Sequence, residues 1–277
     1  MAVTATKASR KGTMNGLPDW ALLLGSVLVY LFLYAPIAVL ILFSFNSTRS
    51  TQVWTGFSFE WYGQLLSDPT ILQAFRTSLV VGVTSTLIAT IIGTLTALAL
   101  SRHRFRGQTV ADSAIYMATV MPEIVVGVSL LVFFVAVFQP IGIDLGITTI
   151  VIAHVAFTIS FVTIVVRARL AGMDRSVEEA AQDLGASPVQ TFFRVTLPLI
   201  LPGVMAGGLL AFTLSFDDFV ITYFVSGVGS STLPLKIYSM IKFGVSPVIN
   251  ALSTVVLVAT LFLIFGGSRL FVRREDA

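Results

Sequence analysis

The stretch EEAAQDLGASPVQTFFRVTLPLILP, from Glu178 to Pro202, is acidic and alanine-rich within a chain that is otherwise apolar. Ser176 and Glu179 have the spacing of a capping box, which predicts that a helix begins here. Four small or apolar residues then share one helical face: Val177, Ala180, Ala181 and Leu184. Gly185 follows at once, where the C-terminal cap of a helix favours positive φ. The stretch therefore predicts a short, capped, amphipathic helix.

The second half of the stretch repeats this pattern. Ser187 and Gln190 form another candidate capping box, with Pro188 at the first helical position. Pro198 predicts the next helix boundary. The expected unit is a helix, a glycine corner and a helix, with three acids facing water or basic groups of a partner: Glu178, Glu179 and Asp183. The residues by themselves support two interpretations equally: a hairpin that packs under the membrane domain, and a helix that docks in a groove of another chain.

The rest of the chain is apolar enough to lie in a membrane. Of 277 residues, 56% are hydrophobic and 11% are charged, which is about half the charged fraction of a soluble domain. Six runs, one of them interrupted only by Glu123, reach the ~20 residues that a bilayer requires. They predict spans at about 20–45, 77–101, 113–138, 146–167, 199–225 and 248–269. Closed β-barrels also satisfy their backbone hydrogen bonds in lipid, but a barrel sequence would show short segments in which apolar and polar residues alternate.

We therefore predict an all-α polytopic membrane protein. Residues 1–19 form a tail, 20–269 a six-span domain that contains the segment 170–198, and 270–277 a second tail. With the N-terminus inside, 13 of the 17 basic residues fall on inner segments and 4 on outer ones, which predicts that both termini and the segment 170–198 are cytoplasmic. The first span is too long for the apolar region of a cleaved signal peptide, so we expect it to be retained.

Composition also limits the chemistry of the chain. The net charge of +3 reflects membrane topology and not nucleic-acid binding. The chain has no cysteine, which excludes disulfides and thiolate metal sites. No paired metal-ligand spacing and no nucleophile–base constellation is present. We therefore expect no metal site and no catalytic residue.

An acid in the third span is the first candidate for a transport path. A carboxylate in the bilayer is costly, so such acids usually line a cavity or pair with another group. Glu123 follows Pro122, which predicts a kink. Four residues are predicted to share one polar stripe: Tyr116, Thr119, Glu123 and Gly127. The alternative is a Glu123 side chain that bonds a neighbouring span purely for packing.

Two further acids lie in the fifth span. Asp217 and Asp218 are adjacent, so on one helix they cannot face the same cavity. Five small or polar residues share a stripe: Gly208, Ala211, Ser215, Asp218 and Thr222. We therefore predict that Asp218 faces a cavity and that Asp217 makes a structural or inter-subunit hydrogen bond. His154, alone in the fourth span, is predicted to be a satisfied packing residue.

The segment between the fourth and fifth spans resembles the EAA motif of ABC-importer permeases. That motif is E-A-A, three residues, G, nine residues and I-x-L-P, and here only the Ile is changed, to Val195. In that family this segment is the coupling helix, which sits in a cleft of a cytoplasmic ATPase subunit. The resemblance therefore assigns ATPase coupling to seven residues: Glu179, Ala180, Ala181, Leu184, Gly185, Leu197 and Pro198.

The resemblance extends over nearly the whole chain. Four longer segments are similar to the spermidine/putrescine permeases, to the second of that system's two membrane subunits: GFSFEWYGQLL (56–66), MPEIVVGVSLL (121–131), LAFTLSFDDFVITYFVSG (210–227) and TLPLKIYSMIKFGVSPVINAL (232–252). This implies the type I ABC importer permease fold, a bacterial inner membrane, a sister permease, a pair of ATPase subunits and a periplasmic binding protein. No G-x-x-x-x-G-K-[ST] loop occurs, so ATP and Mg are expected in the partner ATPase and no cofactor in this chain.

The function implied is that of a permease subunit in an ATP-driven polyamine importer. A polyamine needs spaced carboxylates for its ammonium groups and aromatic faces for cation–π contact. Six residues supply these groups and form the predicted path: Glu123, Asp217, Asp218, Phe216, Phe219 and Tyr223. The alternatives are the same machinery with another cationic or small organic substrate, and a channel or carrier that needs no motor.

Overall fold

The computed structural model describes residues 19–50, 53–242, 244 and 246–275, with side chains described between 20 and 262 within these ranges. The longer helices are α1 (Asp19–Phe43), α3 (Pro69–Arg102), α6 (Ile147–Ala171), α9 (Leu197–Asp217) and α12 (Pro247–Glu275). The shorter ones are α2 (Glu60–Ser67), α4 (Gln108–Val120), α5 (Glu123–Phe133), α7 (Ser176–Asp183), α8 (Pro188–Thr191), α10 (Val220–Val225) and α11 (Leu233–Lys242). The described residues contain no strand beyond one isolated bridge between Asn46 and Phe57. The predicted all-α class is confirmed.

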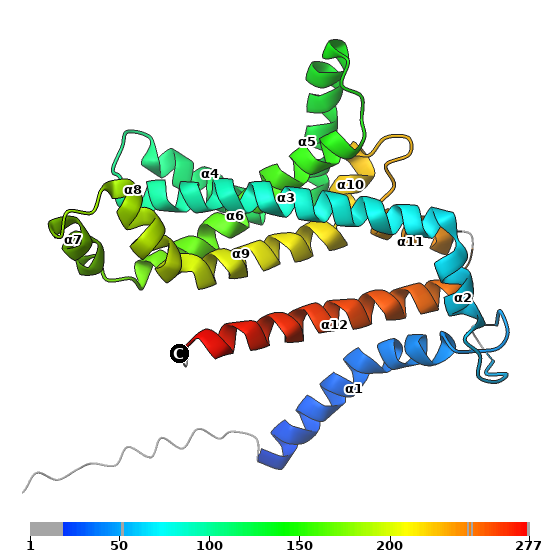
Figure 1. Cartoon of the computed structure of the whole chain (residues 1–277). Coiled ribbons are helices and arrows are strands. Elements are labelled where there is room, and N and C mark those ends of the chain that lie inside the picture. Colours follow the sequence, from blue (N-terminus) through cyan, green and yellow to red (C-terminus); the bar gives the residue numbers. More distant parts are fainter. Residues whose placement is uncertain (1–18, 51–52, 243, 245, 276–277) are drawn as a thin grey trace, which may run out of the picture.

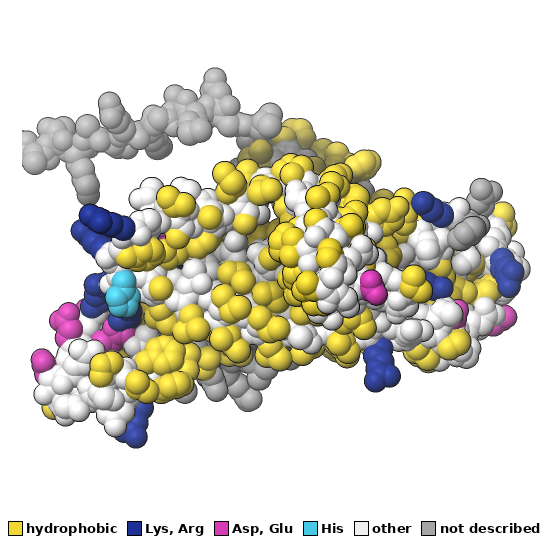
Figure 2. Space-filling model, turned by 90° about the horizontal axis from the view of Figure 1, so that it is seen from above, with side chains coloured by type: hydrophobic (Ala, Val, Ile, Leu, Met, Phe, Trp, Pro, Cys, Tyr) yellow, Lys and Arg dark blue, Asp and Glu magenta, His cyan; other side chains and the backbone are white. Residues whose placement is uncertain are grey.

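The predicted spans correspond to helices of the fold. Five helical stretches are long and apolar enough to cross a membrane: Trp20–Phe43, Pro69–Arg102, Glu123–Ile141, Ile147–Ala171 and Pro188–Asp217. The sixth span corresponds to α12, whose apolar part with described side chains is Pro247–Phe262. Charged side chains gather mostly toward the ends of the molecule, and hydrophobic side chains cover much of its middle (Figure 2).

Some boundaries differ from those predicted. The second span begins at Pro69 and not near 77, because the Asp68 carboxylate accepts a hydrogen bond from the Thr70 N–H at 2.8 Å and caps the helix there. At the other end of the chain α12 continues to Glu275, so the backbone does not leave the helix at the predicted boundary of 270. Residues 1–18 of the predicted N-terminal tail lie outside the described residues.

Three long helices, α3, α6 and α9, form the centre of the molecule and lie side by side (Figure 1). Six buried apolar residues hold one end of this group: Ala97, Val162, Val166, Leu170, Ile200 and Ala211. Small residues let the backbones approach, as is common where membrane helices meet. At Gly93 an added Cβ would lie 2.8 Å from the Cβ of Val162, so α3 and α6 meet there without room for a side chain.

The outer helices leave much of their surface uncovered. α1 and α12 run apart from the central group (Figure 1), and the apolar stretch Trp20–Phe43 has no buried residue. The start of α1 and the end of α12 both point toward the end that carries α7 and α8 (Figure 1). We call this end, which holds Arg102, Arg167, Arg175 and Arg194, the basic end. The first turn of α1 and the last turn of α12 thus lie toward the same end of the molecule as α7 and α8 (Figure 1).

Replacing Gly93 with alanine should weaken the α3–α6 contact. The added methyl overpacks a closed interface, which costs about 1–3 kcal/mol, so the protein in detergent should unfold at a lower temperature. Gly25→Ala on the exposed α1 is the matched control, because nothing lies within 4 Å of its added Cβ. A melting temperature for Gly93→Ala equal to that of Gly25→Ala would contradict this account of the central packing.

Candidate functional site

The third predicted span is interrupted beside its acid. α4 ends at Val120, and Pro122 has an extended backbone (φ −58°, ψ 130°) before α5 begins at Glu123. Proline has no N–H and disfavours a helical conformation in the residue before it, so the chain leaves the helix here. The kink predicted at Pro122 is therefore a complete break. The single stripe predicted from Tyr116 to Gly127 is wrong, because no continuous helix joins them.

The fifth predicted span is also broken at its acids. α9 ends at Asp217, Asp218 is extended (φ −65°, ψ 125°), and α10 follows. The Asp218 carboxylate accepts hydrogen bonds from the backbone N–H of Ile221 at 3.3 Å and of Thr222 at 2.8 Å. It therefore caps the first turn of α10. The region predicted as one helix from 199 to 225 is two helices with a capped joint.

His154 of α6 contacts this second break from the side. Its Nδ1 lies 2.7 Å from Oγ of Ser215, and its Nε2 lies 3.2 Å from Oδ2 of Asp218 and 3.0 Å from Oγ1 of Thr222. The Thr222 hydroxyl donates to the same Asp218 oxygen at 2.7 Å. All these contacts are satisfied when Ser215 donates to Nδ1 and the Nε2–H is shared between the oxygens of Asp218 and Thr222. His154 is 1% exposed and fully bonded, as predicted for a satisfied buried histidine.

The two aspartates differ in exposure, and Asp218 is not placed as predicted. Asp218 lies on the stripe with Ser215 and Thr222, but this stripe packs against α6 and its side chain is only 6% exposed. Asp217, the last residue of α9, is exposed and makes no hydrogen bond or ion pair with the described residues. The prediction that Asp218 faces a cavity is wrong, because the stripe that carries it is covered by α6. The negative end of the α9 dipole and the Asp217 carboxylate together favour a cation.

A cluster of aromatic rings lies next to this break. The ring centroid of Phe219 is 5.7 Å from that of Tyr223 and 4.6 Å from that of Tyr238 on α11. The Nζ of Lys242 lies 5.0 Å from the Tyr238 centroid, so this cluster already contacts one alkylammonium group. Tyr238 was not predicted, because the loop between α10 and α11 separates it from the other rings and no spacing pattern crosses that loop.

The other two predicted path residues have different surroundings. Glu123 lies one helical turn before Gly127, where an added Cβ would be 2.7 Å from the Phe224 ring of α10. No hydrogen bond or ion pair within the described residues joins Glu123 to Asp217. Phe216 stacks on Phe212 at 5.5 Å and packs against the buried cluster of Leu65, Ile71, Ala74, Leu233 and Leu252. The structure thus gives Phe216 a packing environment and leaves Glu123 exposed.

At the basic end, the predicted helix–glycine–helix unit is present. α7 ends in a Schellman motif: Ala186 N–H donates to the carbonyl of Ala181 at 3.1 Å, and Gly185 N–H donates to that of Gln182 at 2.8 Å. Gly185 has φ +89°, which confirms the predicted conformation. The predicted capping box of α8 is also confirmed, since Ser187 N–H donates to Gln190 Oε1 at 3.0 Å and Gln190 N–H to Ser187 Oγ at 3.3 Å.

The start of α7 differs from the prediction. Ser176 is the first helical residue and not its cap, and the Asp174 carboxylate accepts the Ser176 N–H at 2.9 Å. The predicted apolar face is largely uncovered: Val177 and Ala180 are exposed, and Leu184 is 90% exposed. Glu179 is exposed as well. α7 therefore presents small and apolar side chains outward, next to the Schellman motif at Gly185.

One acid of α7 faces the opposite way. Glu178 is 5% exposed and is the only buried residue of α7. Both its oxygens bind the guanidinium of Arg102, one of them at 2.6 Å from Nη2, and Oε1 also accepts from the Thr196 hydroxyl. The prediction that Glu178 faces water or a partner is wrong. The sequence signal for this contact was the basic run at 102–106, to which Arg102 belongs.

The segment after α8 has no boundary at Pro198. A π-helical turn, Phe192–Thr196, connects α8 to α9, so one helical stretch runs from Pro188 to Asp217. The wider π turn changes which carbonyl faces the proline ring, and the helix continues. The predicted boundary at Pro198 is therefore wrong. Leu197 packs against the buried cluster of Val162, Val166 and Leu170, whereas Pro198 is exposed.

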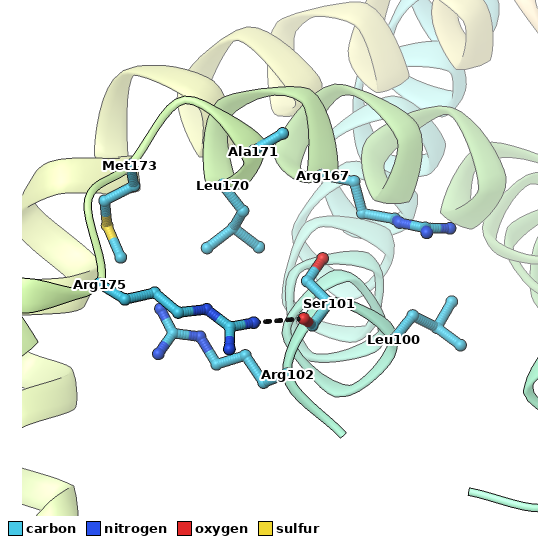
Figure 3. A pocket seen from close by; sticks show the side chains of 8 residues that line it. All are labelled: Leu100, Ser101, Arg102, Arg167, Leu170, Ala171, Met173 and Arg175. Carbon is cyan, nitrogen blue, oxygen red and sulfur yellow. Dashed lines mark hydrogen bonds between the residues drawn. The ribbon is translucent and has the colours of Figure 1, made fainter. Parts of the chain in front are cut away.

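A pocket of about 420 Å³ lies between the last turn of α3, the last turn of α6 and the loop before α7 (Figure 3). Three arginines line it: Arg102, Arg167 and Arg175. Each has a partner, because Arg102 binds Glu178, Arg167 binds Asp112, and Arg175 donates to the carbonyl of Ser101 at 2.9 Å (Figure 3). Arg102 and Arg175 thus connect the last turn of α3 to α7 and to the residue before it. Among the described residues no group of three or more His, Asp or Glu side chains could hold a metal.

Residues 89–274 match the family model of the binding-protein-dependent transport system inner membrane component. The chain belongs to this family, and the predicted ABC-importer permease class is confirmed. It is 44% identical over 269 residues to the putrescine transport system permease protein PotI of Escherichia coli strain K12, covering 95% of each chain. It is also 44% identical over 248 residues to the spermidine/putrescine transport system permease protein PotC of Haemophilus influenzae, covering 90% of this chain and 95% of that one.

Solved structures show the same fold. A bacterial ABC transporter involved in the import of alginate has a TM-score of 0.70 and 20% identity, covering 91% of this chain and 94% of its own. The MetNI methionine ABC transporter has a TM-score of 0.60 and 18% identity. The match covers 79% of this chain and 99% of the transporter chain. At this identity the likeness concerns the fold alone, which is that of an ABC importer permease. The chain is thus an inner-membrane transport component.

The attachment of α7 should depend on pH. Burial disfavours the charged Glu178, but the hydrogen bonds from Arg102 and Thr196 and the nearby arginine charges outweigh it, so the pKa of Glu178 lies below its ordinary value of 4.5. Because the folded pKa is lowered, the stabilisation is complete above pH 4.5 and is lost as the pH falls through the lowered value. A spin label on Asp183→Cys should therefore gain mobility below that pH.

The matched variant is Glu178→Gln, which removes the titrating group. Breaking a buried ion pair from one side costs about 3–5 kcal/mol, and the partly exposed Arg102 favours the lower end of that range. The label on Glu178→Gln should be mobile at every pH. A label that stays immobile in Glu178→Gln, or whose mobility is constant from neutral to acid pH in the parent, would contradict the role of this pair.

Proposed function

We propose that this chain is the permease subunit of an ATP-driven importer for polyamines, putrescine or spermidine. The observation that carries the proposal is its 44% identity, over 95% of both chains, to a protein named as a putrescine transport permease. The geometry supports a cationic substrate independently. Two membrane helices are broken, one at Glu123 and one at Asp217, and broken membrane helices are where transporters place substrate and ion sites.

The break between α9 and α10 has the groups that an alkylammonium requires. Asp217 is exposed at the negative end of a helix of 21 residues. The aromatic cluster of Phe219, Tyr223 and Tyr238 lies next to it, and the Lys242 ammonium on Tyr238 shows the contact that a polyamine would make. Glu123 offers a second carboxylate for a second ammonium group. Asp218 and Phe216 contribute by holding the shape of the break.

The basic end is proposed to face the cytoplasm and to meet the ATPase. The arginine bias supports this orientation, and the exposed face of α7 supports docking in a groove. Within the EAA motif, Glu179, Ala180, Leu184 and Gly185 would contact the ATPase, with Ala181 beside them, while Leu197 and Pro198 belong to the helix that carries motion into the bundle. A pair of ATPase subunits would bind ATP and Mg, and a sister permease would complete the path.

Transport assays separate this proposal from its rivals. The complex of this chain with its partners, reconstituted in liposomes with ATP inside, should take up labelled putrescine or spermidine only when the binding protein is outside. Preferential uptake of a different cation would revise the proposed substrate but leave the proposed ATP-driven importer unchanged. Uptake by this chain alone, without ATP, would overturn the proposal in favour of a carrier or channel.

Replacing Gly185 should uncouple ATP hydrolysis from uptake. A side chain at φ +89° strains the Schellman corner, which costs about 1 kcal/mol or more, and arginine adds a charge where a partner would press. Gly185→Arg should insert in the membrane normally but lose most of its uptake. The measurement is uptake and ATP hydrolysis in the same liposomes. Gly172→Arg, a nearby glycine with φ −88°, is the control and should keep both.

Replacing Asp217 with asparagine should slow polyamine uptake about tenfold or more, because one direct carboxylate–ammonium contact in a low-dielectric path is worth over 1.4 kcal/mol. Tyr238→Leu should also slow it, since the cation loses an aromatic face. Asp144→Asn, in the outer turn before α6, is the control. Uptake at the parental rate in Asp217→Asn would remove this residue from the path.

A further inference from the structure

His154 makes more contacts than the packing of α6 requires. A histidine that only fills space in a core needs one partner for each ring nitrogen. Here three side chains converge on it, and all three belong to the two sides of one helix break: Ser215 from α9, Asp218 from the joint and Thr222 from α10. The imidazole therefore bridges the end of one helix and the start of the next.

The hydrogen bonds of His154 stabilise the conformation of the chain at this break. An extended residue in the middle of a membrane helix leaves carbonyl groups of the preceding turn and N–H groups of the following turn without their usual partners, which is costly in lipid. Asp218 satisfies the N–H groups of Ile221 and Thr222, but its own carboxylate is then buried and needs donors. The Nε2–H of His154 and the Thr222 hydroxyl supply them. Ser215 in turn fixes the ring through Nδ1.

This bridge also determines where Asp217 points. Consecutive side chains of an α-helix lie on neighbouring faces, but next to an extended residue they point to opposite sides. Asp218 is directed inward to His154, and its side chain is 6% exposed. Asp217, one residue earlier, is exposed. Phe219, one residue later, reaches the aromatic cluster with Tyr238 at 4.6 Å.

We propose that His154 is a positioning residue for the transport path. It anchors Asp218 inward and thereby directs Asp217 and Phe219 toward the passing ammonium group. His154 does not touch the substrate in this arrangement. The inference rests on the proposed function only in that the cation is a polyamine; the anchoring itself depends on contacts within this chain.

A double-mutant cycle tests the proposal in the whole complex reconstituted in liposomes. The variants are His154→Leu, Asp217→Asn and the combination, assayed for uptake of labelled putrescine at saturating binding protein. If His154 acts through Asp217, each single variant loses about tenfold or more in rate, and the double variant is no slower than the slower single one. Losses that multiply in the double variant would overturn the proposal, because independent sites add in free energy.

Rescue by a conservative variant distinguishes positioning from bulk packing. His154→Gln keeps an amide N–H at about the reach of Nε2 and should recover much of the uptake that His154→Leu loses. Thr163→Val, which removes another buried hydrogen bond of α6, is the matched control and should leave uptake unchanged. Equal losses in His154→Gln and His154→Leu would overturn the proposal. If His154→Leu does not assemble with its partners, Ser215→Ala takes its place in the same cycle under the same criterion.

A chemical readout tests the anchoring without relying on transport. The chain has no cysteine, so Asp217→Cys places one thiol in it at the position of interest. A cationic methanethiosulfonate reagent should react readily with the thiol of Asp217→Cys. The reaction should be about tenfold slower when His154→Leu is added, because the side chain at this position is then no longer held outward. An unchanged labelling rate would overturn the anchoring. Failure of putrescine uptake in the parent complex, with labelling still dependent on His154, would overturn only the polyamine assignment.

Discussion

The constraint on which this structure depends is that a backbone in lipid must satisfy its own polar groups. An unbroken helix does this by itself, and α6 follows that solution. Where a helix is interrupted, other groups must replace the missing hydrogen bonds. The break between α9 and α10 replaces them with the Asp218 carboxylate, and His154 of another helix stabilises that carboxylate. An irregular joint that a transporter can use for a cation is thus compatible with a membrane.

A second buried carboxylate follows the same logic at the basic end. Glu178 is buried because α7 approaches the bundle, and its charge is compensated by Arg102 from α3 and the hydroxyl of Thr196. A pair of this kind adds little net stability, but it defines one geometry, since removing either partner leaves a buried charge unpaired. α7 is thereby held to two elements of the bundle while its apolar side stays free. An element arranged in this way suits the transmission of a push from a partner into the membrane.

The two sites lie at different levels of the same central helices. α6 carries His154 near the broken joint and Arg167 near the basic end, and α9 connects the π turn that follows α8 to Asp217. Motion of the basic end would therefore be carried by closely packed helices to the groups proposed to bind a cation. The close approach of α3 and α6 at Gly93 gives the bundle few places in which such motion could be absorbed.

The sequence by itself determined the all-α class, the approximate spans, the glycine corner at Gly185 and the family of the EAA motif, because hydropathy, caps and turns are local properties. The tertiary structure alone decided which charged groups face inward. His154 and Asp218 are 64 residues apart, and Arg102 and Glu178 are 76 apart, so no periodicity connects them. The burial of Asp218 at the helix break depends on the distant His154, and a pattern read along the sequence placed Asp218 in a cavity instead.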